Sequence, residues 1–128
     1  MPSVHVNCPV NPSESDEKVE AAIRNIFPDV ELERTDQGFV GRTESLEKFK
    51  TLIRRNKILD TTRNVLLRNS TGRRTKMHLN KQVAFVGKVT FADESTVLGT
   101  IEVTIEDENI EALIDKVAPT TNEGEEIF

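Results

Sequence analysis

The sequence of 128 residues contains no tryptophan and no tyrosine, and its six phenylalanines are the only aromatic residues. It has one cysteine, Cys8, which excludes an internal disulfide and falls short of the four ligands that a structural zinc site usually needs. No run of 18 apolar residues is present, and this excludes a membrane-spanning helix. The first residues lack the basic and apolar stretches of a signal peptide, so we expect a cytoplasmic protein without a membrane partner.

The residues that are present have the composition of one globular domain. Apolar residues make up 36% of the chain and charged residues 30%, which is more polar than average but outside the disordered class. The apolar residues are mainly valine, isoleucine and leucine, a composition typical of strands packed under helices. We therefore predict a single α+β domain over residues 1–128, in which residues 120–128 form a polar tail.

Charge is divided unevenly along the chain. The segment Arg42–Lys81 holds twelve basic and three acidic residues, a net charge of +9, whereas the whole chain carries −5. A basic segment of this kind predicts a positive surface that holds polyanions, because screening makes the local field more important than the total charge. The alternative is that these lysines and arginines form solvated helix faces or pair with acidic residues from the two ends of the chain.

Hydrophobic periodicity predicts strands and helices in a mixed order. The expected elements are, in chain order, a strand at Ser3–Val10, a helix from Ser15 to Ile26, a strand at Val30–Arg34 with a brief extension at Phe39–Val40, a helix at Thr43–Asn56, a helix from its cap Asp60 to Asn69, a strand at Lys76–Leu79, antiparallel strands at Lys88–Phe91 and Thr100–Ile105 joined through a turn at Ala92–Ser95, and a helix capped by Asn109 and ended by Pro119. This order predicts a two-layer sandwich of the α+β class, with a mainly antiparallel sheet and helices on one face.

Local signals leave two connections open. A break at Asn56–Lys57 predicts either two helices folded back on each other or one kinked helix. Asn80 either caps a short helix that Gly87 ends in a left-handed conformation, or lies in a continuous strand at Met77–Val86. In the first strand Cys8 alternates with valines, so we expect a buried thiol with a structural role.

Motifs for catalysis are lacking. The two histidines, His5 and His78, lie on the polar phase of predicted strands, where a surface position is more common than a catalytic or metal-binding role. Gly38–Arg42 lacks the spacing of a phosphate-binding loop, and neither a Gly-x-Ser-x-Gly nor a His-Glu-x-x-His motif is present. We therefore expect a protein that is not an enzyme and that has no metal site, no cofactor and no small-molecule substrate.

The basic segment supplies the candidates for a nucleic-acid site. Helical phasing brings several of its cations together beside an apolar stripe, and the loop that follows adds more, so that they could hold phosphates. Aromatic platforms that stack bases are missing from this segment apart from Phe49 and Phe85, which we expect in the core. The candidate nucleic-acid-binding residues are Lys50, Arg54, Lys57, Arg73, Arg74, Lys76 and Lys81.

Four short motifs resemble a small archaeal family of uncharacterised proteins. They lie at Ile58–Arg63, Leu79–Val89, Leu98–Ile101 and Ala118–Thr121, and the Leu-Asn-Lys-Gln-x-Ala block in the second is the most specific. Members of that family are similar in fold to the large-subunit ribosomal protein that binds 5S RNA, and distantly similar to archaeal RNA-binding or exosome-associated proteins. The resemblance implies this α+β fold and an RNA partner, and it supplies no catalytic residues.

Two hypotheses for function follow. The first is a non-enzymatic cytoplasmic module that binds RNA through the basic segment at residues 42–81. The second is a structural or protein-interaction domain that forms a homodimer through a sheet edge or a helix face and has no nucleic-acid role. The strands at Val4–Val10, Lys88–Phe91 and Thr100–Ile105 are the candidate surfaces for such a dimer.

Overall fold

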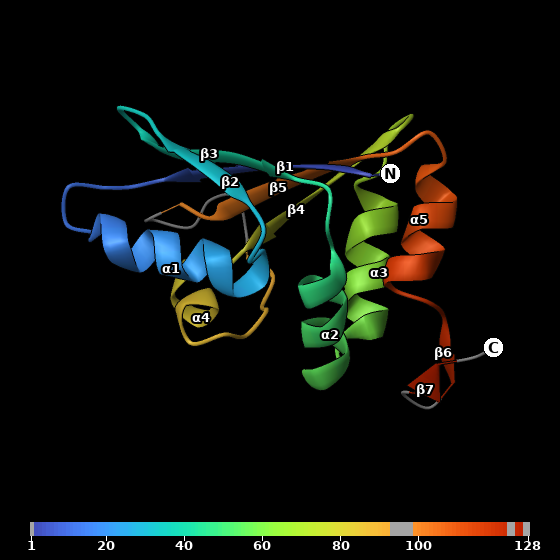
Figure 1. Ribbon diagram of the computed structural model, residues 1–128. Helices are drawn as coiled ribbons and strands as arrows, with labels where there is room; N and C mark the ends of the chain where they lie inside the picture. Colours follow the sequence, from blue (N-terminus) through green and yellow to red (C-terminus); the bar gives the residue numbers. More distant parts are fainter. Residues whose placement is uncertain (1, 93–98, 123–124, 127–128) are drawn as a thin grey trace.

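The computed structural model describes residues 2–92, 99–122 and 125–126. One antiparallel sheet has the strand order β2-β3-β1-β5-β4 and consists of β1 (Ser3–Pro9), β2 (Glu31–Arg34), β3 (Gly38–Thr43), β4 (Arg74–Leu79) and β5 (Ile101–Glu106). The helices are α1 (Asp16–Ile26), α2 (Glu47–Arg55), α3 (Leu59–Arg68), α4 (Lys81–Phe85) and α5 (Ile110–Val117). All of these helices lie on one side of the sheet (Figure 1), so the predicted α+β sandwich is confirmed.

The C-terminal tail adds a second, very small sheet. It is a pair of antiparallel strands, β6 (Thr121–Asn122) and β7 (Glu125–Glu126). In Figure 1 this pair hangs below α5, away from the five-stranded sheet.

The central strand shows why the sheet has one buried face. In β1 the side chains of Val4, Val6 and Cys8 are buried, whereas those of His5 and Asn7 between them are exposed. Side chains on a strand point alternately to the two faces, so an alternating sequence gives one apolar and one polar face. β1 pairs with β3 on one side and β5 on the other. The predicted burial of the single thiol is confirmed.

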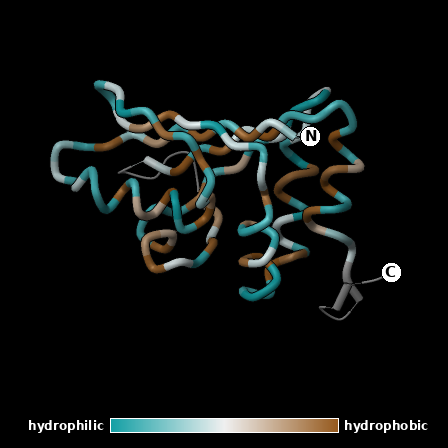
Figure 2. The backbone as a smooth tube through the Cα atoms, viewed as in Figure 1, coloured by the Kyte–Doolittle hydropathy of each residue, from teal (hydrophilic) through white to brown (hydrophobic). Residues whose placement is uncertain are grey.

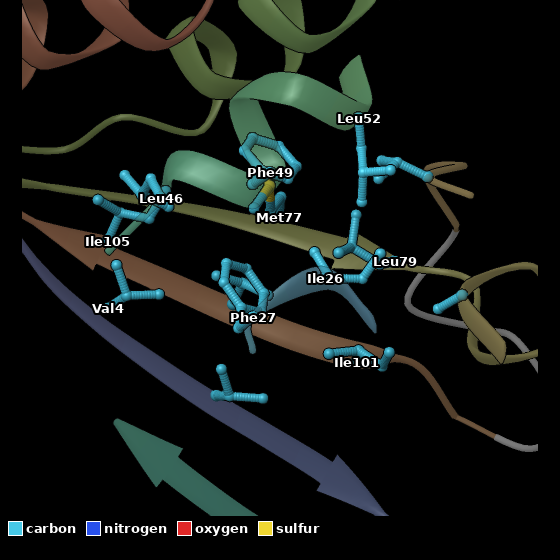
Figure 3. Packing of buried hydrophobic residues seen from close by; sticks show 14 of the residues in the cluster. Val4, Ile26, Phe27, Leu46, Phe49, Leu52, Met77, Leu79, Ile101 and Ile105 are labelled. Carbon is cyan, nitrogen blue, oxygen red and sulfur yellow. The ribbon is translucent and has the colours of Figure 1, made fainter. Parts of the chain in front are cut away.

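Large apolar side chains fill the space between sheet and helices (Figure 3). Phe27, which follows α1, and Phe49 of α2 stack with their ring centroids 6.2 Å apart and an interplanar angle of 18°. Met77 of β4 and Ile105 of β5 supply the facing surface of the sheet. Each such buried side chain contributes roughly 1.5–3 kcal/mol relative to exposure. In Figure 2 the turn between β2 and β3 is mainly hydrophilic, whereas α3 and α5 are largely hydrophobic where they lie side by side.

Side-chain caps set the starts of three helices. The Ser15 hydroxyl accepts a hydrogen bond from the backbone N–H of Lys18 at the start of α1. Asn80 and Asn109 cap α4 and α5 in the same way, at 3.0 and 3.1 Å. Gly87 follows α4 with φ +80°, a conformation that glycine adopts without strain. The short helix after Asn80 is therefore confirmed, and the alternative of a continuous strand is wrong.

The boundaries of α2 and α3 differ from the prediction. Thr43 ends β3, and α2 begins only at Glu47. Asp60 lies inside the first turn of α3 rather than at its cap, which is Ile58 and has no side-chain hydrogen bond. The end of α2 and the start of α3 are set at Lys57. Its positive φ of 57° breaks the helical path, so that α2 ends before it and α3 begins soon after it, at Leu59. The break at this position thus separates two helices.

The predicted pairing of Lys88–Phe91 with the strand at Thr100–Ile105 is wrong. The N–H of Val89 donates instead to the side-chain oxygen of Asn56, at 3.0 Å, and Phe91 forms only an isolated bridge with Leu79. β5 pairs instead with β1, from the start of the chain, and with β4, which the segment containing α4 separates from it. Of the turn predicted between the two strands, residues 93–98 lie outside the described residues.

The edges of the sheet are β2 and β4. β1 and β5 are interior strands, so of the two alternatives for a dimer at these strands the free edge is wrong, and pairing through their uncovered face stays a prediction. On the outer side of β4, Asn69 donates its side-chain N–H to the carbonyl of Lys76 at 2.9 Å, and the N–H of Ala92 donates to the carbonyl of His78 at 2.8 Å. These contacts occupy carbonyls that a second strand would need.

Candidate nucleic-acid interface

The uncovered face of the sheet carries polar and charged side chains. Strand register places them in rows that cross the sheet, with the cations of β4 at one edge and carboxylates of β2 at the other. We call this surface the open face, and its side chains are Ser3, His5, Asn7, Glu31, Glu33, Val40, Arg42, Arg74, Lys76, His78, Glu102, Thr104 and Glu106.

A hollow lies on this face where α3 turns into β4, at the same end of the sheet as the N-terminus (Figure 1). It has a volume of about 760 Å³. Three of its side chains are cations from one short stretch of sequence, and the rest are polar with a single carboxylate. We call it the β4 corner, and it is lined by Asn69, Thr71, Arg73, Arg74, Thr75, Lys76, His78, Thr104 and Glu106.

A tight turn presents the cations of the β4 corner. Thr71 and Arg74 exchange two backbone hydrogen bonds of 2.8 and 3.1 Å, and Gly72 between them has φ +62°. The carbonyl of Arg73 accepts a hydrogen bond of 2.9 Å from the N–H of Asp107, which ties the turn to the end of β5. Arg73 and Arg74 are thereby exposed at a backbone position that is fixed on both sides.

Carboxylates are interleaved with these cations. Arg74 lies 3.2 Å from Glu106, and Lys76 lies 3.7 Å from Glu102 across the β4–β5 pair. All four side chains are well exposed to solvent. Exposed pairs of this kind contribute little to stability, so a phosphate can replace the carboxylate as partner at small cost. The β4 corner is therefore a mixed surface with positive side chains at its rim.

The cations predicted on α2 do not join the β4 corner. Lys50 pairs with Glu47 at 3.1 Å, and Arg54 donates to the carbonyls of Lys50 and Val117. Lys57 is exposed, but it lies just before α3, whereas the β4 corner follows the other end of that helix. The ten residues of α3 separate the two by about 15 Å. The predicted cations of α2 and of the α2–α3 junction thus lie apart from those of the β4 corner.

Lys81 has a third location, in the interior. Its side chain is only 6% exposed and donates to the carbonyl of Pro9 at 2.6 Å and to the Glu14 carboxylate at 2.9 Å. Burial works to raise the pKa of Glu14, but hydrogen bonds from the Asn11 backbone and from Lys81 outweigh it and lower the pKa. Lys81 is therefore a structural cation.

The thiol of Cys8 is also buried. Burial raises the pKa of this thiol to about 12, which keeps it protonated.

Another cation from the basic segment serves the fold. Arg63 of α3 pairs with Asp115 at 2.8 Å and donates to the carbonyl of Ala118 at 3.2 Å. Together with Arg54 it satisfies backbone carbonyls at the C-terminal end of α5, where positive charge is favourable. Counting charges along the sequence could not separate these internal cations from those at the surface.

No signal in the sequence indicated the neutral members of the β4 corner. Asn69, Thr71 and Thr104 come from three different elements, and no sequence pattern connects them. His78 lies on the open face, as the polar phase of its strand predicts, but it is half-buried and contacts the hydroxyl of Thr100 at 2.9 Å. Within residues 2–92, 99–122 and 125–126, no group of three or more side chains has the composition of a metal site, and no helix is long and apolar enough to cross a membrane.

Residues 3–107 match the model of a protein family described as RNA binding, and the chain belongs to that family. It is 42% identical over 124 residues to a UPF0200/UPF0201 protein of Archaeoglobus fulgidus, with 94% of this chain and 38% of that protein covered. It is 38% identical to a UPF0201 protein of Sulfurisphaera tokodaii, over 97% of this chain and 92% of that one. The chain is thus a member of the UPF0201 family, and it spans about two fifths of the length of the A. fulgidus relative.

Solved structures agree with this assignment. The crystal structure of a UPF0201 protein from Methanococcus jannaschii covers all of both chains with 38% identity and a TM-score of 0.89. A DUF54 protein from Archaeoglobus fulgidus covers 92% of this chain and 96% of its own, with 20% identity and a TM-score of 0.62, and it shares the fold. The predicted resemblance to a small archaeal family is confirmed.

Proposed function

We propose that this chain is a non-enzymatic module that binds RNA through the β4 corner. The observation that supports the proposal is the placement of Arg73, Arg74 and Lys76 around one hollow on the uncovered face of the sheet. This hollow lies within the stretch that matches the RNA-binding family.

The chemistry of the β4 corner suits the phosphate backbone. Arginine presents a planar fork of N–H donors that matches phosphate oxygens, and lysine adds a point charge. Binding releases counterions from the nucleic acid, so a few cations are enough for measurable affinity at low salt. The negative total charge of the chain is a weaker influence, because at 0.1 M salt charges beyond roughly 10 Å are screened.

The test replaces Arg73, Arg74 and Lys76 together by alanine and measures RNA affinity at several salt concentrations. We expect weaker binding at low salt, and a salt dependence of log affinity that flattens by roughly 0.7–0.9 for each phosphate that the variant no longer neutralises. A matched control replaces Lys48, Arg55 and Lys88, which are exposed on other parts of the molecule, and so removes the same charge. The control should keep the original slope.

Two outcomes would contradict the proposal. If the triple variant and the control lose affinity equally, the β4 corner has no special role and only total charge matters. If the wild-type chain binds no RNA at low salt, the module has another function. The substitution Lys57→Asn tests separately whether the cation at the end of α2 contributes to RNA binding. Asparagine is suitable because it tolerates the positive φ of this position.

A second function, self-association as a homodimer, is favoured by one observation. Phe85 and Val86 at the end of α4 are 44% and 66% exposed, which is unusual for large apolar side chains beside each other. Sedimentation of the full chain at tens of micromolar tests this candidate. A dimer that the double substitution Phe85→Ser and Val86→Ser converts to a monomer would support it, and a wild-type monomer would dismiss it.

A further inference from the structure

We infer that the β4 corner holds double-helical RNA by its phosphates and ribose 2′-hydroxyls, and that it does not bind unstacked bases. This inference rests on the proposed function and specifies its substrate class.

The first argument is the placement of the aromatic residues. Recognition of single-stranded RNA depends on bases that stack on aromatic side chains. The chain has no tyrosine or tryptophan, the rings of Phe27, Phe39 and Phe49 are buried in the core, and the partly buried Phe91 packs against that core. Phe85 is exposed, but it belongs to α4 in the helical layer on the other side of the sheet. Among the described residues, the open face therefore carries no phenylalanine, tyrosine or tryptophan, and the ring of His78, the one histidine that lines the β4 corner, is half-buried and contacts Thr100.

The second argument is the regular spacing of polar side chains on a rigid element. Arg74, Lys76 and His78 point to the same side of β4, so their Cα atoms are about 6.6 Å apart in sequence order. Such a row suits successive phosphates along one strand of a helix. Double-stranded RNA is recognised mainly through its shape, its phosphates and its 2′-hydroxyls, and polar groups in a fixed row on a strand suit such contacts.

The third argument is the carboxylate inside the β4 corner. Glu106 repels phosphate, and a surface that only held phosphates would be stronger without it. A carboxylate is, however, a strong acceptor for a hydroxyl, and Thr104 beside it on β5 both donates and accepts. The ribose 2′-hydroxyl distinguishes RNA from DNA. Glu106 and Thr104 thus fit a ribose and disfavour a DNA backbone.

The test compares three nucleic acids of the same sequence: an RNA duplex, a DNA duplex and the single-stranded RNA. We expect the RNA duplex to bind most tightly, by about tenfold over the DNA duplex, which is the scale of one hydrogen bond to a charged group. The substitution Glu106→Ala should reduce this ratio, because it removes an acceptor for the 2′-hydroxyl and also the repulsion of phosphate. Thr104→Val, which keeps the side-chain shape, should reduce it as well.

Glu102→Ala is the matched control. It removes a carboxylate that pairs with Lys76 but does not line the β4 corner, so it should raise the affinity for both duplexes and leave their ratio unchanged. Tighter binding of single-stranded RNA, or equal binding of the two duplexes, would overturn this inference and leave RNA binding intact. Failure of every RNA to bind would overturn the proposed function as well.

Discussion

Lys81 belongs to the basic segment of the sequence, but in the structure its side chain is buried. Its ammonium group lies between the Pro9 carbonyl at the end of β1 and the Glu14 carboxylate before α1. Asn11 donates both its backbone and its side-chain N–H to the same carboxylate, at 3.0 and 2.9 Å. A buried ion pair is tolerated only when its remaining hydrogen-bonding groups are satisfied, and here the β1–α1 connection satisfies them. The pair joins that connection to α4.

Lys81→Met tests this pair, since it keeps the length of the side chain and removes its charge. We expect a loss of about 3 kcal/mol in the free energy of unfolding, because the Glu14 carboxylate keeps its burial and loses its cation. Chemical denaturation measures the loss. The exposed Lys88→Met is the control and should change stability by less than about 0.5 kcal/mol.

The lowered pKa of Glu14 makes stability depend on pH. In the unfolded chain this carboxyl returns to its ordinary pKa of 4.5. Because the folded-state pKa is lower, its contribution is fully present above pH 4.5 and is lost as the pH falls toward the folded-state pKa. Denaturation at a series of pH values should show this loss in the wild type and a shallower loss in Glu14→Gln. The same steepness in both would show that Glu14 has no part in it.

The starts of α1, α4 and α5 are determined directly by local sequence, because a single capping residue sets each of them. The side chain of Asn109 accepts from the N–H of Ala112 and so satisfies a donor at the start of α5. We expect Asn109→Ala to cost about 1 kcal/mol in the free energy of unfolding. Asn64→Ala, within exposed α3 sequence, is a control that removes the same side chain without a cap. Equal effects of the two substitutions would contradict a capping role.

The sequence predicts those elements whose signals are local. β1 alternates over its whole length, and Ser15, Asn80 and Asn109 cap helices that the structure contains. The wrong prediction that Lys88–Phe91 pairs with the strand at Thr100–Ile105 arose because strand pairing is not a local property. Strand pairing is a contact between distant segments, and nothing in the sequence of β5 indicates that its neighbours are β1 and β4.

The candidate site was predictable only in part, for a related reason. The sequence predicts exposed cations at Arg73, Arg74 and Lys76, and in the structure Arg73 lies in the turn before β4 whereas Arg74 and Lys76 lie in its first three residues. The burial of Lys81 depends on Pro9 and Glu14, which are about seventy residues away in the sequence. A charge pattern indicates how many cations a surface could have, but tertiary contacts decide which of them reach it.

The whole molecule has a charge gradient across the open face. Arg74 and Lys76 lie on β4 at one edge, and Glu31 and Glu33 lie on β2 at the other, four strand spacings or about 19 Å away. At this distance the interaction of the carboxylates with RNA bound at the β4 corner depends strongly on salt.

The double substitution Glu31→Gln and Glu33→Gln should therefore raise RNA affinity by about twofold at 0.01 M ionic strength, where the Debye length is about 30 Å. At physiological ionic strength, with a Debye length of about 8 Å, the affinity should not change. Titration of the variant and the wild type under both conditions measures this. An equal gain at both ionic strengths would point to direct contact of β2 with RNA.

The one-sided covering of the sheet also has a consequence for divergence among relatives. The side chains that hold the fold together lie between the strands and the helices, whereas strand register places those of the open face on the other side of the sheet. Selection can therefore alter the two sets of positions almost independently. A family with this architecture could exchange one nucleic-acid target for another by substitutions on the open face alone, at little thermodynamic cost. A library randomised at His5, Asn7 and Thr104 should accordingly yield mostly folded chains.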